Sequence, residues 1–346
     1  MLTMLVLACA PVDCDVEDGV ATDSAVDTAE DTGEIELEPH ADADGDGLPD
    51  SWGDPVYWEE SLLEPLILPE SLPDTDHWEL RIATSPDGVS WVPDERIIAY
   101  GMSSLDLIVL GDWLIVTGML DAQLYRENPG IEPFYRISAL ATEDLLNWGG
   151  VIWDIENGSD TYLVDPALQR GVDGVLRASW FAHSSAGADP ADIEGAHDVQ
   201  RGTWSTSGAW VQDDDDPEYG DEWLVDPVIC ELGGKQWLFY SHEHSRIRAA
   251  VADVGQETFE RFEPFSWEGT TVPFCSSDGT EITLLGQAPG GLEAPRTGKF
   301  SNEGAFTEGA SLYKNHPWGD NCTSPVYGKH KGQWVLACAA YVRLGL

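Results

Sequence analysis

Short apolar segments separated by turn residues recur from about residue 78 to the end of this chain. The clearest copy, LVDPVICELGGKQWLFYSHE, spans residues 224–243 and consists of an apolar segment, a Gly-Gly turn and a second apolar segment. Corresponding segments carry a proline at the same place, and these prolines lie 46 to 61 residues apart: Pro166, Pro227, Pro273 and Pro325. A fifth, weaker copy begins at Ser103, with Leu105 in the proline position. Because two apolar segments around a short glycine-containing turn are typical of a β-hairpin, the pattern predicts five hairpins.

A second motif follows the hairpin in several units and predicts two further strands. ATSPDGVSW ends at Trp91, ATEDLLNW at Trp148 and WSTSGAW at Trp210. Four short strands in a unit of about 50 residues are typical of a propeller blade. The repeats begin with this outer motif and end with a hairpin, so the last blade should combine both ends and leave no open sheet edge. The predicted fold is therefore all-β, a five-bladed β-propeller over residues 78–346, with a β-sandwich as the alternative.

Composition and charge narrow the choice of partners. The chain has 346 residues, 42% of them hydrophobic, with 15 Trp and 35 Gly, which suits an all-β domain with many tight turns. A net charge of -46 repels nucleic acid and anionic membrane surfaces. We therefore expect no nucleic-acid partner, and we expect a monomer.

The N-terminal part differs from the rest, since no Lys or Arg precedes Arg81. Residues 9–40 are acidic and contain no aromatic residue, which predicts a disordered tether. Ahead of it, MLTMLVLACA resembles the end of a bacterial lipoprotein signal, although a basic n-region is missing. The resemblance implies a signal peptide over residues 1–8, lipidation of Cys9, and an exported protein held at the membrane or cell surface only through its lipid anchor. An ordinary apolar N-terminus is the alternative.

A third segment, residues 41–54, is rich in aspartate and resembles the calcium repeats of bacterial surface proteins and of thrombospondins. Oxygen ligands at alternate positions, with a glycine at the sixth, suit Ca²⁺. The ligands would be Asp42, Asp44, Asp46 and Asp50. The bidentate Glu of an EF-hand is missing at the twelfth position, so a single weak site is expected. The alternative is more acidic spacer, and residues 55–77 are interpreted as a linker.

Four of the six cysteines fall in the predicted propeller. Cys322 and Cys338 lie eight residues on either side of His330, where GKHKGQW is expected to turn. A hairpin centred there would place them opposite each other and within reach of a disulfide. Cys230 and Cys275 occupy corresponding strands of consecutive units and are a second candidate pair. Buried free thiols are the alternative for all four.

The residues at the X-Pro step are the candidates for chemistry, because inner strands of a propeller begin at the mouth of the central channel. These residues are Ser104, Asp165, Asp226, Val272 and Ser324. Two carboxylates from neighbouring blades would then face one cavity, as glycoside hydrolysis requires. The alternative is structural, since an aspartate before proline can accept backbone hydrogen bonds and hold the turn.

The motifs TSPDGVSW and ATEDLLNW, together with the X-Pro strands, resemble the five-bladed propellers of glycoside hydrolase family 43 and its relatives. The resemblance implies a general base Asp in blade 1, an Asp that tunes the acid in blade 2, and a Glu general acid in blade 3. Asp165 matches the blade 2 position. Blade 3 has Asp226 in place of Glu, and blade 1 has Ser104, with Asp106 two residues further on. Glu243 or Glu293 could supply the missing acid from a loop.

Other side chains near the predicted mouth are candidates for binding a sugar. They are His183, His242, Glu243 and Trp180. Surface histidines and a core tryptophan are the alternatives. Two classes of function remain open: an exported glycosidase-like propeller that hydrolyses or binds glycans through its channel carboxylates, and a non-catalytic surface binding or scaffold protein.

Overall fold

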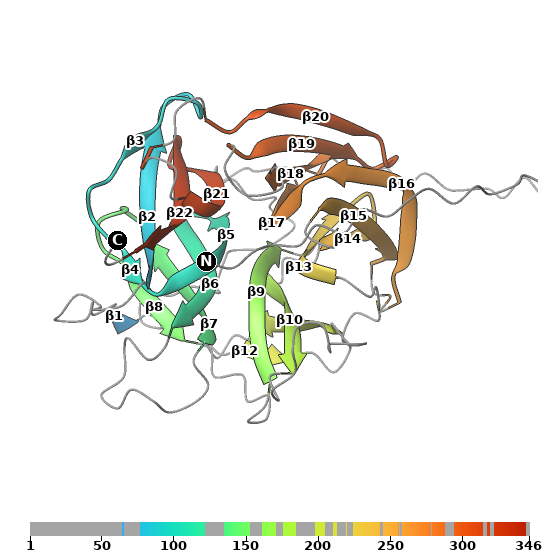
Figure 1. Cartoon of the computed structure of the whole chain (residues 1–346), viewed down its shortest axis with the longest axis horizontal. Coiled ribbons are helices and arrows are strands. Elements are labelled where there is room, and N and C mark those ends of the chain that lie inside the picture. Colours follow the sequence, from blue (N-terminus) through green and yellow to red (C-terminus); the bar gives the residue numbers. More distant parts are fainter. Residues whose placement is uncertain are drawn as a thin grey trace, which may run out of the picture. The chain divides into compact units, whose positions relative to one another are not determined.

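The computed structural model describes sixteen segments of the chain. They are residues 64–65, 77–121, 135–152, 161–170, 176–184, 198–204, 210–212, 219, 224–242, 245–254, 256, 258–277, 279–287, 294–313, 317–318 and 322–343. Within these segments all regular structure is β, and no α-helix occurs (Figure 1). The described part of the chain accordingly contains no helix that could cross a membrane. The predicted lipidation site Cys9, the predicted calcium ligands and Glu243 lie outside the described residues.

The strands form five separate antiparallel sheets, each built outward from one hairpin. The first contains β5 (Met102–Leu110), β6 (Trp113–Asp121), β7 (Tyr135–Thr142) and β8 (Gly149–Ile152), with β1 (Glu64–Pro65) added at its outer edge. The second contains β9 (Thr161–Arg170), β10 (Leu176–Ser184), β11 (Asp198–Trp204) and β12 (Trp210–Gln212). The third contains β13 (Leu224–Leu232), β14 (Lys235–His242), β15 (Arg246–Asp253) and β16 (Glu260–Glu268).

The last two sheets complete the set. The fourth contains β17 (Thr270–Ser277), β18 (Glu281–Gln287), β19 (Arg296–Ser301) and β20 (Phe306–Ser311). The fifth contains β21 (Cys322–His330), β22 (Gln333–Val342), β2 (His77–Ser85) and β3 (Val92–Pro93), and β4 (Ala99–Tyr100) also pairs with β2. These sheets are referred to as blades 1 to 5 in this order.

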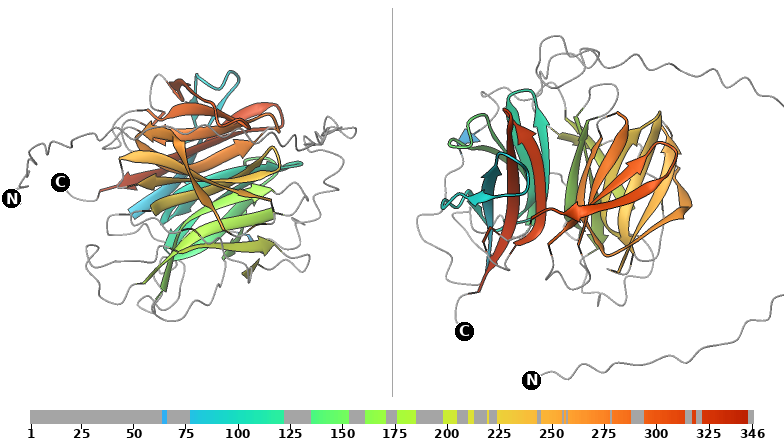
Figure 2. Two further views of the ribbon diagram at one scale, coloured as in Figure 1. Left: turned by 90° about the vertical axis from the view of Figure 1, so that its right-hand side faces the viewer. Right: turned by 90° about the horizontal axis from the view of Figure 1, so that it is seen from above.

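The first strands of the five blades lie around a common centre (Figure 1). Contacts run from β21 to β5, β9, β13 and β17 and from there back to β21, so the ring is closed. In the side views the sheets lie next to one another, and their strands cross the molecule in similar directions (Figure 2). This arrangement confirms the predicted β-propeller.

Blade 5 joins the two ends of the propeller, as the order of the motifs predicted. Strand β2 pairs with β22 from His77↔Val342 to Ser85↔Trp334. Strand β22 pairs on its other side with β21, and the turn between them lies between His330 and Gln333. The two ends of the propeller are thus joined by a backbone ladder within blade 5, and neither end leaves an unpaired inner strand.

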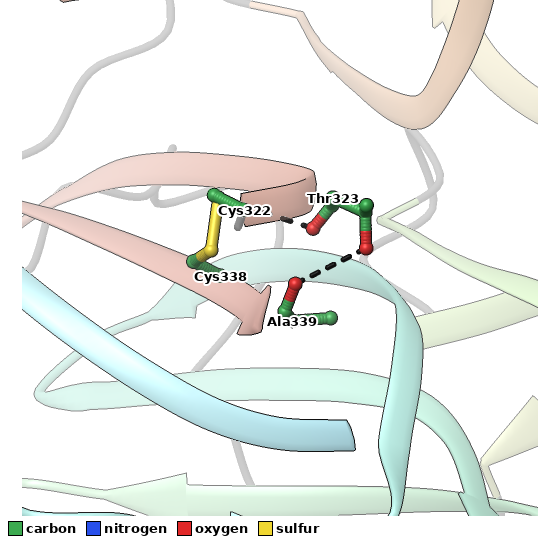
Figure 3. Close-up of a disulfide and its surroundings, with 4 residues drawn as sticks. All are labelled: Cys322, Thr323, Cys338 and Ala339. Atoms are coloured by element: carbon green, nitrogen blue, oxygen red, sulfur yellow. Dashed lines mark hydrogen bonds between the residues drawn. A yellow bond between two sulfur atoms is a disulfide. The ribbon is translucent and has the colours of Figure 1, made fainter. Parts of the chain in front are cut away.

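A disulfide joins Cys322 to Cys338 within blade 5, and the predicted pairing is confirmed (Figure 3). The Cα atoms lie 5.6 Å apart, although Cys322 is in register with Ala340 rather than with Cys338. The partners are therefore diagonal neighbours across the two strands. Next to the disulfide, Thr323 Oγ1 donates a hydrogen bond to the carbonyl of Ala339 at 3.1 Å. Cys230 is also disulfide-bonded, while the side chain of Cys275 is not among those described, so their pairing stays a prediction.

Apolar side chains between neighbouring blades hold the inner strands in place. Between blades 3 and 4 the rings of Trp237, Phe239 and Phe265 pack around Phe300, with ring centroids 4.6 to 5.6 Å apart. Another cluster joins blades 5 and 1 and includes Leu80 and Leu107. The packing of each blade against its neighbours therefore buries apolar residues of the inner strands, such as Leu105 and Leu110 of β5.

The SPDG motif and its counterpart form the same turn in blades 5 and 1. Asp87 Oδ1 accepts the N–H groups of Val89 and Ser90 at 2.9 and 2.7 Å. In the second turn, Asp144 Oδ1 accepts the N–H groups of Leu146 and Asn147 at 2.7 and 2.8 Å. Two backbone donors stabilise the ionised carboxylate, so the N–H groups of Asn147 and Leu146 lower the pKa of Asp144 to about 2. These aspartates hold turns, which explains why the motif recurs.

Candidate functional site

Each inner hairpin is interrupted by a β-bulge at the X-Pro step. The pairing register shifts in all five hairpins, for example between Ser103 and Asp106 in β5 and between Val225 and Val228 in β13. Four residues in these bulges have a left-handed backbone: Ser104 (φ 49°), Asp165 (φ 52°), Asp226 (φ 52°) and Ser324 (φ 46°). A bulge turns a side chain away from the regular alternation of the strand. The X-Pro step is therefore a shared structural device that redirects one side chain in each of these blades.

The bulges of blades 2 and 3 bring Asp165 and Asp226 together. The two carboxyl groups share a hydrogen bond, and burial, followed by repulsion from Asp165, raises the pKa of Asp226 well above its ordinary value. Ser241 Oγ also donates to Asp226 Oδ2 at 3.2 Å, which favours the ionised form and partly opposes this rise. Two carboxylates in contact do not both ionise readily, so the pair holds one proton over part of the pH range.

Ser241 is a participant that the sequence analysis missed. It is fully buried in β14, and its backbone is in register with Val225, directly before Asp226. The available signal was the register of the hairpin, because a serine opposite the residue before an X-Pro aspartate lies within reach of that carboxylate. Its hydroxyl fixes one oxygen of Asp226, so the orientation of this carboxyl group is set from within blade 3.

Asp106, the predicted base of blade 1, occupies a different environment. Its side chain is 1% exposed, and Oδ1 accepts the N–H of Leu107 at 2.7 Å. Oδ2 accepts the N–H of Leu168, in the inner strand of blade 2, at 2.5 Å. Burial raises the pKa of Asp106 well above its ordinary value, and the two N–H donors act in the opposite direction. With both oxygens occupied, Asp106 is better explained as a link between two blades than as a base that meets a substrate.

The other predicted sugar-binding residues are placed as follows. Trp180 in β10 is fully buried, so its ring cannot stack on a sugar, and the core alternative describes it. His242 ends β14 in register with Leu224, two residues before Asp226, and is half-buried. The side chain of His183 and the whole of Glu243 lie outside the described part of the structure. Of this set, Trp180 lies opposite the bulge of Asp165, and His242 lies at the end of the strand that pairs with the bulged strand of Asp226.

Among the described residues, no group of three or more His, Cys, Asp or Glu side chains could hold a metal ion. The bulges therefore present a carboxyl pair and hydroxyls rather than a metal-binding cluster. Such a pair can donate and accept protons through Asp226 and can hydrogen-bond a hydroxylated ligand.

Comparison with known proteins gives structural likeness without close sequence similarity. No protein-family model matches the chain, and no curated protein matches it. An α-L-arabinofuranosidase from Podospora anserina is 13% identical, with a TM-score of 0.44 over 79% of this chain and 98% of that one. A family 43 arabinoxylan arabinofuranohydrolase from Bacillus subtilis is 13% identical (TM-score 0.45; 70% and 63% covered). A protein of unknown function from Dyadobacter fermentans is also 13% identical (TM-score 0.49; 76% and 84% covered). A likeness at this level does not extend any of these activities to the present chain.

Proposed function

We propose that this protein acts on glycans through the Asp165–Asp226 pair at the mouth of the propeller channel, and that the reaction is hydrolysis of a glycosidic bond. The observation that carries the proposal is the hydrogen bond between these two carboxyl groups, which come from neighbouring inner strands. Asp226 is the proposed general acid, because its raised pKa keeps it protonated where an ordinary carboxyl group would be ionised. Asp165 is proposed to tune and orient it.

The contact between the carboxyl groups also limits the mechanism. Glycosidases that use two opposed carboxyl groups hold them about 5 to 9.5 Å apart, on either side of the scissile bond. Hydrogen-bonded carboxyl groups lie closer together than this, so the pair acts as one proton-donating unit. The base or nucleophile of the proposed reaction is therefore a separate group, and the buried Asp106 is poorly placed for that role.

A second candidate function is glycan binding without catalysis. The observation in its favour is the burial of Asp106, which leaves no second carboxylate assigned opposite the pair among the described residues. In this case the Asp165–Asp226 pair would serve as a hydrogen-bonding site for sugar hydroxyls. The protein would then be a surface binding propeller.

A substrate screen with matched variants separates these possibilities. Arabinosides, xylosides, galactosides and fructans are offered to the wild-type protein, Asp226→Asn, Asp165→Asn and the control Asp253→Asn, which changes an exposed aspartate at the end of β15. The proposal expects hydrolysis that both pair variants abolish and the control retains. Glycan binding without turnover would favour the second candidate. If the protein neither binds nor hydrolyses any of these glycans, both candidate functions are excluded.

We also propose that the protein is exported and attached to a membrane through lipidated Cys9, with a weak calcium site at Asp42, Asp44, Asp46 and Asp50. The Cys322–Cys338 disulfide supports export, because such bonds persist in oxidising compartments. Calorimetric titration of the intact protein with Ca²⁺ tests the metal site. A weak binding signal should disappear in Asp44→Ala, and identical titrations of the two proteins would exclude these ligands.

A further inference from the structure

Left-handed backbone at non-glycine residues is concentrated in the bulges of the inner strands. Six described non-glycine residues have positive φ, and four of them are Ser104, Asp165, Asp226 and Ser324. An L-residue pays a conformational cost in this region that glycine does not. Four blades nevertheless carry a polar side chain there. Strained residues that persist in this way point to a role for the side chain itself.

The strands that carry these four residues are consecutive around the ring. Strand β21 contacts β5, β5 contacts β9, and β9 contacts β13. Asp165 and Asp226 demonstrate that side chains at neighbouring bulges meet, because they share a hydrogen bond. Ser324 and Ser104 occupy the same bulge in blades 5 and 1 and have the same backbone conformation. The four consecutive bulges therefore carry hydroxyl groups in blades 5 and 1 and carboxyl groups in blades 2 and 3.

The two serine hydroxyls are available to a ligand. Both side chains are half-buried, and neither makes a hydrogen bond to the described part of the protein. Other hydroxyls near the same level are engaged: Ser241 binds Asp226, and Thr323, next to Ser324, binds the carbonyl of Ala339. A half-buried hydroxyl on a strained backbone, with no hydrogen-bond partner among the described residues, is suited to a ligand that supplies one.

We infer that Ser104 and Ser324 form, with Asp165 and Asp226, a ring that selects neutral, hydroxyl-rich glycans over anionic ones. The four positions include two carboxyl groups and no cation, and the whole chain has a net charge of -46. A uronate or sialate would meet repulsion from the carboxyl pair without a compensating positive charge in the ring. Neutral sugar hydroxyls can donate to carboxylates and exchange hydrogen bonds with serines. The choice of a glycan as the ligand rests on the proposed function, whereas the role of the two serines is inferred from their left-handed backbone in the bulges.

The strain provides a test that a merely structural serine would fail. Replacing Ser104 or Ser324 with glycine removes the cost of the left-handed conformation and also removes the hydroxyl. Each variant should melt a few degrees higher, while its affinity for a neutral oligosaccharide falls about five- to tenfold, the loss expected for one hydrogen bond. Ser104→Ala and Ser324→Ala lose the hydroxyl and keep the strain, so they should bind as weakly without melting higher.

Lys331→Gly is the matched control for relief of strain. Lys331 also has a left-handed backbone (φ 45°), but it lies in the turn at the far end of β21 from Ser324. Its contact with Asp112 is an exposed ion pair at 3.5 Å, which contributes little to stability. This variant should melt higher than wild type and bind neutral oligosaccharides unchanged.

Binding is measured by calorimetric titration of the full chain with neutral xylo-, arabino- and galacto-oligosaccharides and with oligogalacturonate as the anionic probe. The inference stands if a neutral oligosaccharide binds, oligogalacturonate does not, and the glycine and alanine variants bind more weakly. It is overturned if serine removal leaves binding unchanged, if the anionic probe binds equally well, or if no neutral oligosaccharide binds. Hydrolysis that survives removal of both serines would overturn this inference and leave the proposed function intact. Binding that depends on the serines but is not followed by hydrolysis would overturn the proposed function and leave this inference intact.

Discussion

The carboxylate of Asp106 in blade 1 accepts the backbone N–H of Leu168 in blade 2 at 2.5 Å. A side chain of one inner strand thus satisfies a backbone donor of the next, and its other oxygen accepts the N–H of Leu107. This is a directed polar link between two inner strands, in addition to the apolar packing between the blades. It also accounts for a buried aspartate between the apolar residues Leu105 and Leu107.

Removing this link should destabilise the protein. Asp106→Ala leaves two buried N–H groups without acceptors, at a cost of about 2 to 4 kcal/mol in the free energy of unfolding. Asp106→Asn keeps one acceptor and should lose less. Urea denaturation measures both, with Asp112→Asn as control, because the Asp112 side chain is 72% exposed. If Asp106→Ala instead abolished hydrolysis and left the free energy of unfolding unchanged, Asp106 would be assigned the role of a base.

The acid pair should make the stability depend on pH. The pKa of Asp226 is higher in the folded state than in the unfolded state. At pH values between these two pKa values, the folded state therefore binds more protons than the unfolded state. The contribution of Asp226 to stability therefore falls as pH rises above about 4, until the folded pKa is passed. Asp165→Asn removes the repulsive charge and should reduce this fall by about 1.4 kcal/mol for each pKa unit that the charge contributes.

Chemical denaturation between pH 4 and pH 8 checks the pair. The difference between Asp165→Asn and wild type should grow with pH in favour of the variant. Asp106 also has a raised pKa, but it is present in both proteins and its contribution cancels in the difference. Parallel stability curves would mean that the two carboxyl groups do not interact in solution.

The turn at Asp144 should respond to pH in the opposite sense. Backbone N–H groups lower its pKa to about 2, so its contribution to stability is complete above the unfolded value and is lost as pH falls through the folded one. Asp144→Ala should lower the melting temperature at pH 7 and lower it less at pH 3. Glu143→Ala, the neighbouring change in the same turn, is the control. A loss that is equal at both pH values would assign the effect to something other than the carboxylate.

The Cys322–Cys338 disulfide should contribute measurably to the stability of blade 5. The bond closes a loop with a sequence separation of 16 residues, and loops of this length correspond to about 3 kcal/mol in the free energy of unfolding. Replacing both cysteines with serine should lower the urea midpoint accordingly. An unchanged midpoint would indicate that the ladder between β21 and β22 holds the hairpin without the bond.

The proposed lipid anchor is tested in a bacterial host. Cys9→Ser should move the protein from the membrane fraction to the soluble fraction, because a lipid attached to Cys9 is its proposed membrane attachment. The melting temperature of the purified variant should not change, since the site precedes the propeller. Membrane association that survives the substitution would remove the anchor.

The sequence alone determined the architecture, because turn chemistry and alternation are local. The X-Pro steps and glycine turns predicted the five hairpins, the position of the SPDG motif predicted that β2 would complete the last blade, and the spacing of Cys322 and Cys338 predicted their disulfide. The same reasoning grouped Asp165 with Asp226, since equivalent positions in neighbouring blades converge.

Only the tertiary structure decided what each side chain meets. The partner of Asp106 is the N–H of Leu168, which belongs to another blade, and the burial of Trp180 depends on the packing around its strand. The bulges shift the alternation of every inner strand, so the direction of Ser104 or Ser324 does not follow from counting along the chain. Local sequence sets where a strand begins and turns. The register of its bulge and the neighbour on either side decide which residues are exposed at the mouth and which are buried between blades.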